Sequence, residues 1–389
     1  MSLLKVVQPL FWFSKPLGVL PLTFRDGRFL VSKLSLLYSA CGVACFVIGG
    51  YGRTLKNTLK LFSKPIEGSE ILTFVSSSIV NIFGVLNIYY SAVCAKKLSH
   101  MFNELNVLMR STRNLSYMES ALMVRSIVIV LQIFVFFNYM FISILQTGLD
   151  YMELFKATTR ILSLTSITCI STHFCALCLV LRSLIKSMNS ELEQTLSSCS
   201  ASNLNLQSAE KRLHVRMLRY RYVYAKIFDV CSDMNNLFGI FILLALTQYN
   251  IYIHVEVFGI ISVLIDFNIK SNSEWTVEHT RSLIWAFVNV MKIMSHFVCC
   301  SLVISETKKT GTISSKYLAR LPRGAALESI DCFSRAVAAM KLAFSANGFF
   351  SIDWEILFSS ASACTVNTLI LIQSYVNNHP DTGIVTGTE

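Results

Sequence analysis

Apolar residues along this chain are gathered into long runs, and charged or polar segments separate one run from the next. A helix needs about 20 mostly apolar residues to cross the hydrocarbon core of a bilayer. Seven runs predict spanning helices, at 34–51, 71–94, 126–147, 161–181, 237–264, 283–304 and 350–376. All six prolines fall outside these runs, so we expect the helices to be uninterrupted. The predicted fold is therefore an all-α, polytopic membrane protein.

The composition agrees with a chain that folds in lipid. Of its 389 residues, 53% are hydrophobic and only 15% are charged, against about 25% charged in a typical soluble domain. The mean hydropathy is +0.55. The first 30 residues contain three prolines and no uninterrupted apolar core, so we expect no cleavable signal peptide. The first span would then target the chain to the membrane.

The distribution of lysine and arginine predicts which way the chain crosses the membrane. The side that holds the N-terminus carries 25 of these residues, and the opposite side carries 8. Since cytoplasmic loops are enriched in Lys and Arg, the N-terminus is predicted to be cytoplasmic and the C-terminus extracellular. A basic face against anionic lipid and cytosol also accounts for the net charge of +11 without a nucleic acid partner. The single N-x-S/T sequon, at Asn114, would lie in a cytoplasmic loop and escape glycosylation.

This orientation divides the chain into segments with different expected roles. They are a cytoplasmic N-terminal segment at 1–33, helices one to four at 34–181, a cytoplasmic helical extension at 182–236, helices five and six at 237–304, a cytoplasmic anchor helix region at 305–349, the seventh helix at 350–376 and an extracellular tail at 377–389. Apolar residues recur on one face in 211–231 and in 326–345, which predicts two amphipathic helices outside the membrane. A flexible loop is expected around Ser197–Ser208.

The two amphipathic helices have three interpretations. Each stripe could lie on the membrane surface, pack in an intramolecular bundle, or form a cytoplasmic extension where subunits meet. The second stripe is expected to run from Leu327 to Phe344. The spacing of the apolar residues alone leaves all three alternatives open.

Residue patterns for catalysis and metal binding are missing from the sequence. The chain has no glycine-rich phosphate loop with lysine, no HExxH and no GxSxG motif. Its seven histidines are scattered, and Glu256, Asp353 and Glu355 are the only acids near spans. The Cys175–Cys178 pair has neither a second pair nor a histidine cluster beside it. We therefore expect no enzyme activity, no catalytic residue, no metal and no cofactor.

The seventh run ends in amide side chains, which cost free energy in hydrocarbon unless they face protein or water. On a helix, Gln373 shares a face with Val366, Leu369, Ile370 and Asn377. A stripe of amide and branched aliphatic residues is typical of a constriction that dewets when closed and hydrates when open. One stripe cannot surround a pore, so this interpretation requires an oligomer. Hydrogen bonding between the helices of a single bundle explains the stripe equally well.

The end of the chain resembles a known family. The stretch 342–375 is similar to the C-terminal signature of insect gustatory receptors. The sequence GFFSID at 348–353 matches the family's motif before the last span, and LILIQ at 369–373 matches its hydrophobic run and glutamine. Val366 and Asn367 stand where the family has Thr-Tyr, and Ser374 stands where it has Phe. These departures argue against the sugar-sensing branches.

The resemblance implies a ligand-gated, non-selective cation channel in the plasma membrane of sensory neurons. It would be a homotetramer, or a heterotetramer with related receptors, surrounded by membrane lipid. The seventh helix would line the pore, and the cytoplasmic ends of helices four to seven would form a shared anchor. The implied pore and gate residues are Val366, Leu369, Ile370, Gln373, Ser374 and Asn377. Two other classes stay open: a seven-helix G-protein-coupled receptor, whose N-terminus would be outside, and a solute transporter.

In this family ligands bind in the extracellular half of the helix bundle, so we predict the binding residues from their depth. Aromatic and amide groups concentrate in the outer halves of helices three, five and six, at Phe137, Asn138, Tyr139, Gln248, Tyr249, Tyr252, Trp285 and Asn289. Such a lining suits a small planar organic tastant, and we expect a bitter or other plant-derived molecule. An aromatic belt at the outer interface explains Tyr252 and Trp285 as well. Lys292 lies deeper and is expected to face the bundle interior or a water-filled cavity.

Overall fold

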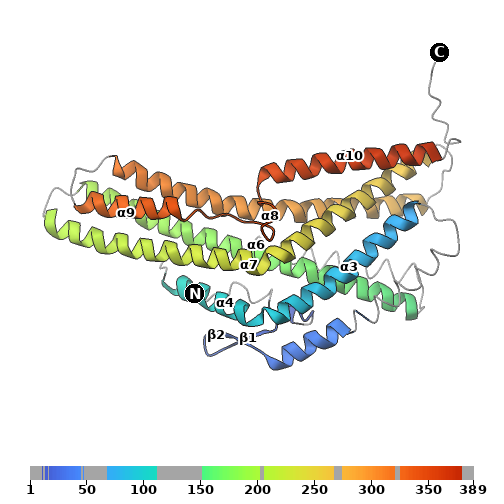
Figure 1. The fold of residues 1–389 in the computed structure, drawn as a ribbon, viewed down its shortest axis with the longest axis horizontal. Helices are drawn as coiled ribbons and strands as arrows, with labels where there is room; N and C mark the ends of the chain where they lie inside the picture. Colours follow the sequence, from blue (N-terminus) through green and yellow to red (C-terminus); the bar gives the residue numbers. More distant parts are fainter. Residues whose placement is uncertain are drawn as a thin grey trace, which may run out of the picture.

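The structure is a computed structural model that describes residues 11, 14–15, 17–44, 47, 68–111, 151–201, 206–266, 274–319 and 325–378. Its helices are α3 (Gly68–Val93), α4 (Ala95–Ser111), α6 (Tyr151–Ala201), α7 (Leu206–Asp266), α8 (Glu274–Leu318), α9 (Ala325–Ala339) and α10 (Trp354–Asn378). A hairpin of β1 (Leu22–Arg25) and β2 (Arg28–Val31) precedes them. Figure 1 shows an elongated molecule whose long helices run roughly along its length. The predicted all-α, polytopic fold is confirmed, and the small hairpin is an addition to it.

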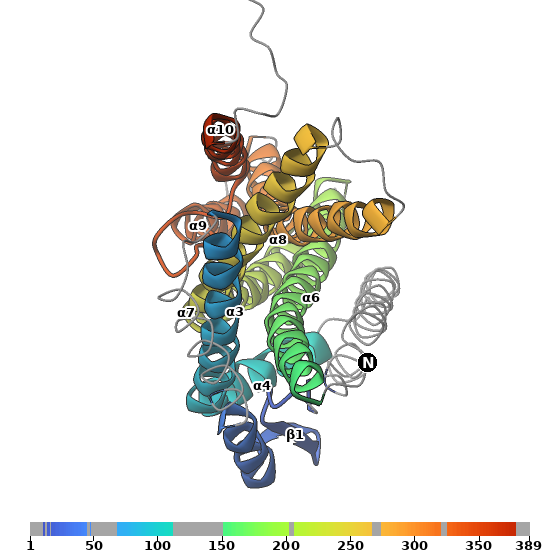
Figure 2. The ribbon, with the colours of Figure 1, turned by 90° about the vertical axis from the view of Figure 1, so that its right-hand side faces the viewer.

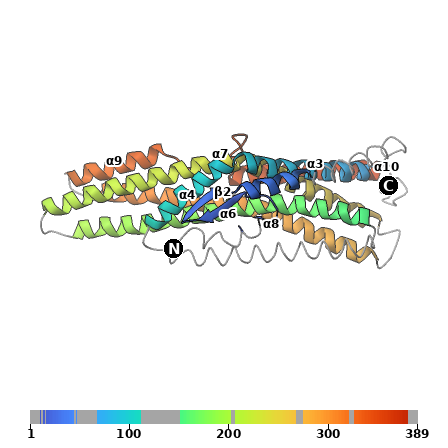
Figure 3. The same cartoon turned by 90° about the horizontal axis from the view of Figure 1, so that it is seen from below.

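Three helices run through most of the length of the molecule. The helices α6, α7 and α8 contain 51, 61 and 45 residues. At 1.5 Å per residue, α7 is about 90 Å long, roughly three times the thickness of a bilayer's hydrocarbon core. Each of these helices joins an apolar part to a polar part, and Figures 1 and 3 show each one as a continuous helix. The loop expected around Ser197–Ser208 is mostly helical, because α6 continues to Ala201 and α7 begins at Leu206.

Within the described ranges, four helices are long and apolar enough to cross a membrane, and they belong to α6, α7, α8 and α10. A fifth is obtained if α3 and α4 count as one span, which is bent by 67° around Cys94. In the region of the first predicted span, the structure has a short apolar helix, Lys33–Ala44. The third predicted span, 126–147, lies outside the residues that the structure describes.

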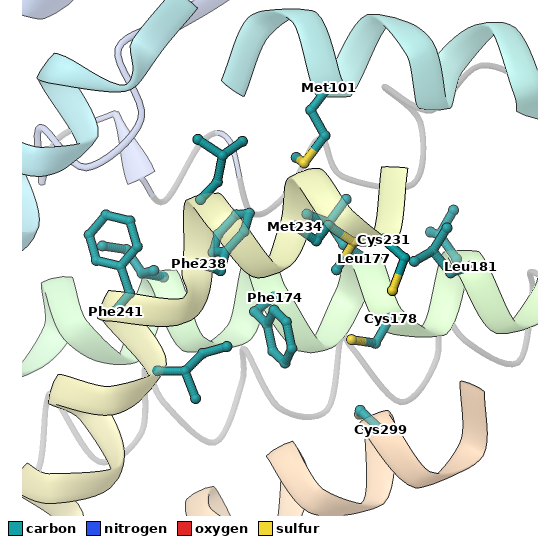
Figure 4. Packing of buried hydrophobic residues seen from close by; sticks show 14 of the residues in the cluster. Met101, Phe174, Leu177, Cys178, Leu181, Cys231, Met234, Phe238, Phe241 and Cys299 are labelled. Atoms are coloured by element: carbon teal, nitrogen blue, oxygen red, sulfur yellow. The ribbon is translucent and has the colours of Figure 1, made fainter. Parts of the chain in front are cut away.

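Buried apolar side chains form two main clusters along the long axis. The larger one lies where α3, α4, α6, α7 and α8 meet, and Figure 4 shows part of it around Phe174, Met234 and Phe238. The smaller one, which we call the distal core, joins α6 and α7 to α8 and α9. Its members are Met188, Leu192, Leu196, Leu213, Met217, Tyr220, Tyr224, Ile313, Tyr317, Ile330, Phe333 and Val337. The helix predicted over 211–231 is confirmed, and its apolar stripe packs in an intramolecular bundle.

The hairpin of β1 and β2 is hydrogen-bonded to α4 at Gly27, whose carbonyl oxygen accepts from Asn106 Nδ2 at 3.1 Å, and at the buried Phe29. Phe29 is fully buried, and its backbone N–H donates to Oδ1 of Asn103 at 2.8 Å. The carbonyl oxygen of Phe29 accepts from Asn103 Nδ2 at 3.0 Å and from the Ser99 hydroxyl at 2.6 Å. The N-terminal part of the chain is thereby fixed to the helix that follows the bend.

The segment between α9 and α10 contains a tight antiparallel turn, residues 343–352, which we call the linker hairpin. Asn347 and Gly348 have φ angles of 52° and 77°, and two consecutive positive φ angles are the conformation that Asn-Gly favours in a two-residue hairpin turn. The N–H of Ile352 donates to the carbonyl oxygen of Phe344 at 2.9 Å across the hairpin. The helix predicted over 326–345 is therefore too long: α9 ends at Ala339, and Phe344 belongs to the hairpin.

The linker hairpin is seated on α7. The side-chain amide of Asn235 donates to the carbonyl oxygen of Ala343 at 2.5 Å and accepts from the N–H of Ser345 at 3.3 Å. A Cβ on Gly239 would lie 2.7 Å from the backbone nitrogen of Asn347. The hairpin therefore approaches α7 this closely because residue 239 is glycine, and the contact fixes the start of α10 relative to α7.

Candidate functional site

α10 contacts the rest of the subunit along one face. The hydroxyl of Ser360 donates to Oδ1 of Asn250 on α7 at 3.1 Å. One turn further on, Sγ of Cys364 lies 3.6 Å from Nδ1 of His254. Thr368 continues this face and is only 6% exposed. Figures 1 and 2 show α10 at the periphery of the helix assembly, in agreement with this one-sided contact.

The opposite face of α10 is uncovered. The residues expected in the pore or gate are all on the exposed side, at Val366, Leu369, Ile370, Gln373, Ser374 and Asn377. The first three are 52%, 54% and 57% exposed. A face that combines aliphatic side chains with amides suits neither bulk water nor lipid alone. What covers it in the membrane must offer apolar contacts to some of these side chains and water or protein to the others.

A polar and aromatic cluster lies between α6, α7 and α8, and we call it the Lys292 cluster. Nζ of Lys292 donates to Oγ1 of Thr168 at 3.2 Å. It also lies 5.3 Å from the ring centroid of Tyr249 and 5.6 Å from that of Trp285. The hydroxyls of Tyr249 and Ser171 are 3.1 Å apart and form a hydrogen bond. Residues from three helices therefore surround one cationic group.

Five of the eight residues predicted for ligand binding lie in this part of the bundle, at Gln248, Tyr249, Tyr252, Trp285 and Asn289. Four of them are at most 2% exposed, and Trp285 packs against a buried group that includes Tyr252. Asn289 precedes Lys292 by one turn of α8, and its amide donates to the carbonyl oxygen of Trp285 at 2.9 Å. Tyr252 thus lies inside the bundle rather than on its outer surface. The other three predicted residues, Phe137, Asn138 and Tyr139, lie outside the described residues.

Several polar atoms near this level are buried and have no hydrogen-bond partner among the described residues. They include both amide atoms of Gln248 and Nε2 of His296. Nδ1–H of His296 donates to the carbonyl oxygen of Lys292 at 2.8 Å, which leaves Nε2 as the unpaired nitrogen of that ring. Buried polar groups are generally bonded to protein or water. A water molecule or a polar group of a ligand that reached these atoms would supply the missing hydrogen bonds.

The sequence analysis missed the side of the cluster that α6 provides. Thr168 and Ser171 are not among the predicted residues, although they follow one another at a spacing of three and are both buried. Small polar residues at spacings of three and four in a spanning helix face other helices rather than lipid. Hydroxyl spacing within 161–181 was the signal that could have identified them.

A series of ring contacts joins the Lys292 cluster to the linker hairpin. The His296 ring stacks on Phe174 of α6, with centroids 6.1 Å apart and an interplanar angle of 16°. Phe174 meets Phe344 edge-on at 5.8 Å. Because the carbonyl oxygen of Phe344 accepts from Ile352, two residues before α10, packed contacts connect the cluster with the start of the peripheral helix.

Known proteins match the chain in sequence family and in fold. A family model described as 7tm Chemosensory receptor matches residues 7–378, whereas no curated protein matches the chain. The structure of the insect olfactory receptor OR5 from Machilis hrabei is similar, with a TM-score of 0.70, 14% identity and coverage of 96% of this chain and 98% of that one. The same receptor in complex with eugenol has a TM-score of 0.70 and 12% identity, with coverage of 95% and 98%. At these identities, the structural likeness concerns the fold.

Proposed function

Because this chain belongs to the 7tm chemosensory receptor family, we propose that it is a gustatory receptor that acts as a ligand-gated, non-selective cation channel. Four subunits, identical or related, would surround a central pore in the plasma membrane of a sensory neuron. The N-terminus would be cytoplasmic, α10 would line the pore, and the ends of α6, α7, α8 and α9 at the distal core would form the cytoplasmic anchor.

The observation that carries this proposal is the uncovered face of α10. Ile370 and Gln373 lie on that face, away from the side on which Thr368 is buried. Four copies around an axis would give the amides water to face and would place the aliphatic side chains in a constriction that dewets when closed. A G-protein-coupled receptor or a transporter that works as a single chain offers no partner for this stripe.

The ligand would bind at the Lys292 cluster. Aromatic rings with a few hydrogen-bonding groups are typical of small-molecule sites, and Tyr249 and Trp285 provide such rings beside Thr168. The similar olfactory receptor has been solved in complex with eugenol, which supports a small organic ligand here. We propose bitter or other plant-derived molecules, because the chain departs at Val366, Asn367 and Ser374 from the family's motif.

Cysteine substitution on α10 tests the pore. Each of Ile370, Gln373, Ser374 and Asn377 is replaced by cysteine, and an external, membrane-impermeant thiol reagent is applied during whole-cell recording with a panel of plant compounds and sugars. We expect modification to change the evoked current at one or more of these positions. Thr368→Cys is the matched control, because residue 368 faces α7 and modification there should have no effect on the current.

Three results would contradict parts of the proposal. If none of the four substituted cysteines changes the current on modification, α10 does not line the pore. Glycosylation of Asn114 in cells would show that the predicted orientation is wrong, since glycans are added outside the cytoplasm. Strong responses to simple sugars, with none to plant compounds, would overturn the ligand class and leave the channel intact.

A further inference from the structure

Lys292 places a cationic group inside the helix bundle, in the middle of α8. Its ammonium lies against two buried residues, Thr168 and Tyr249, which are 6% and 1% exposed. A charged side chain within a spanning segment is costly, and it usually faces a partner, a backbone carbonyl or water. The chemical groups around Nζ therefore indicate which kind of ligand would bind beside Lys292.

The groups around Lys292 only partly compensate its charge. Nζ has three N–H donors, and one of them goes to Oγ1 of Thr168. The Thr168 hydroxyl in turn donates to the carbonyl oxygen of Leu164 at 2.8 Å. The rings of Tyr249 and Trp285 lie within 6 Å of Nζ, the range of a cation–π contact. Hydroxyls and ring faces stabilise a cation, but neither supplies a negative charge.

Within the described part of the chain, no carboxylate forms an ion pair with Lys292. The ion pairs seen between described residues join Asp26, Glu104, Glu193 and Asp331 to other cations, and none of them includes Lys292. An anion that reaches a cation inside a helix bundle interacts with it more strongly than in bulk water, because water screens the pair less there. Among the described residues, the cluster thus combines two aromatic faces with one cation that uses one of its three donors on Thr168.

We propose that this site selects small aromatic molecules that carry a carboxylate or an acidic phenol, with the anionic oxygen bound to Nζ of Lys292 and the ring against Tyr249 and Trp285. The proposal rests on the function proposed above, in which the Lys292 cluster is the ligand site. A protonated amine is disfavoured at the same place, because it would bring a second positive charge beside Lys292. The receptor therefore discriminates between plant acids and plant amines of the same shape.

The test compares ligands that share the same ring and carry terminal groups of different charge. Equilibrium binding is measured on the purified full-length receptor in lipid nanodiscs, with three sets of probes built on phenyl, naphthyl and indole rings. Each set contains a carboxylate, the primary amide of that acid and the corresponding primary amine. Because hydrogen bonds to charged groups are stronger than those between neutral groups, we expect the best acid to bind about 10- to 100-fold more tightly than its amide. The amine should bind most weakly.

Variants at Lys292 show whether this residue causes the preference. Lys292→Met keeps an unbranched side chain and removes the charge, so the acid should bind no more tightly than its amide. Lys292→Arg keeps the charge and should keep the preference for acids. Lys308→Met is the matched control, because Lys308 is an exposed lysine on the same helix and its loss should leave the preference unchanged.

Each remaining outcome decides against the proposal or against the function on which it rests. If no acid binds, if amides or amines bind as tightly as the acids, or if the preference survives in Lys292→Met, the proposal is wrong. Where that variant does not reach the membrane, the ranking of probes on the unmodified receptor decides alone. Acid binding without ligand-evoked current would contradict the channel function and leave the ligand class standing. Currents evoked only by neutral or cationic compounds would contradict the proposed ligand class and leave the channel function standing.

Discussion

At the scale of single residues, Gly239 allows the linker hairpin to pack directly against α7. A methyl group there would lie 2.7 Å from the backbone nitrogen and 2.9 Å from the Cα of Asn347. Both atoms belong to the backbone of the linker hairpin and cannot rotate away as the end of a side chain can. The site therefore has no room for alanine unless the hairpin moves off α7.

Gly239→Ala is expected to destabilise the receptor by about 1–3 kcal/mol, the usual cost of overpacking a well-packed contact. The loss should appear as a lower unfolding midpoint of the purified receptor in nanodiscs. Gly311→Ala on α8 is the control, because a Cβ at Gly311 meets nothing within 4 Å. It should be neutral or stabilising by up to about 1 kcal/mol, since alanine is the better helix former. Equal changes in the unfolding midpoint for the two variants would show that the close contact between the hairpin and residue 239 does not contribute to stability.

The site residues show how far the sequence reaches at this scale. The spacing of Val366, Ile370 and Gln373 was enough to predict that they share a face, because helical period depends only on position along the chain. Contacts such as those of Phe174 with His296 and Phe344 depend on how three segments pack. Nothing local to residue 174 distinguishes it from any other apolar residue of a span, so this path could not be predicted.

At the scale of elements, α10 begins at a residue that satisfies its first turn. Oδ1 of Asp353 accepts the N–H of Ile356 at 3.1 Å, and the Ser351 hydroxyl donates to Oδ2. These two hydrogen bonds, that of Ser351 first, lower the pKa of Asp353 below its ordinary value. A carboxyl whose pKa is lowered on folding stabilises the folded state above its ordinary pKa. That contribution is lost as the pH falls through the folded-state pKa.

Asp353→Ala is expected to cost about 0.5–2 kcal/mol, the range for loss of an N-cap. Asp353→Asn keeps a side-chain oxygen in the capping position and should cost much less at neutral pH. Thermal unfolding of the three proteins between pH 3 and pH 7 provides the measurement. The unmodified receptor should lose its advantage over the alanine variant as the solution is acidified. A constant difference over that range would show that the carboxylate charge does not contribute.

The elements also show where hydropathy is informative and where it fails. Apolar runs located the membrane-embedded parts of α6, α7 and α8, because burial in lipid requires such runs. The polar continuations of these helices have no such runs, and only the period of 211–231 revealed one of them. In 326–345 the same kind of period was misleading, because the Asn347–Gly348 turn pairs the residues before it with those after it. The chain therefore forms the linker hairpin at 343–352, although the apolar spacing over 326–345 is that of a helix.

At the scale of the whole molecule, the distal core has an outer surface that is apolar as well. On α7, Val215, Leu218 and Tyr222 are 60%, 51% and 64% exposed, and they lie on the side opposite the residues that pack in the distal core. These positions belong to the polar part of α7, where lipid is not expected to cover them. That subunits meet at the cytoplasmic extension is still a prediction, and we now predict that they meet at the face of α7 that carries Val215, Leu218 and Tyr222.

Leu218→Glu is expected to weaken assembly and to leave the fold of the subunit intact, because it introduces a charge into an apolar contact between subunits. Light scattering of the purified receptor after size exclusion should show a smaller mass than that of the unmodified protein. Lys308→Gln on α8 is the control, since it also changes the net charge by −1, at an exposed position outside this face of α7. If both variants keep the mass of the unmodified receptor, this face is not an interface.

The way α10 joins the molecule has a mechanical consequence. The helices α6, α7 and α8 are continuous rods that pass from the apolar bundle to the distal core, whereas α10 starts afresh after the linker hairpin. Such a joint is a pivot, and α10 is the arm that extends from it. From Trp354 to Gln373 the arm measures about 28 Å, so a tilt of a few degrees carries Gln373 sideways by about 2 Å. In the proposed tetramer, such a tilt of all four arms would change the width of the passage between them, and the contacts of Ser360 and Cys364 with α7 would shift with each arm.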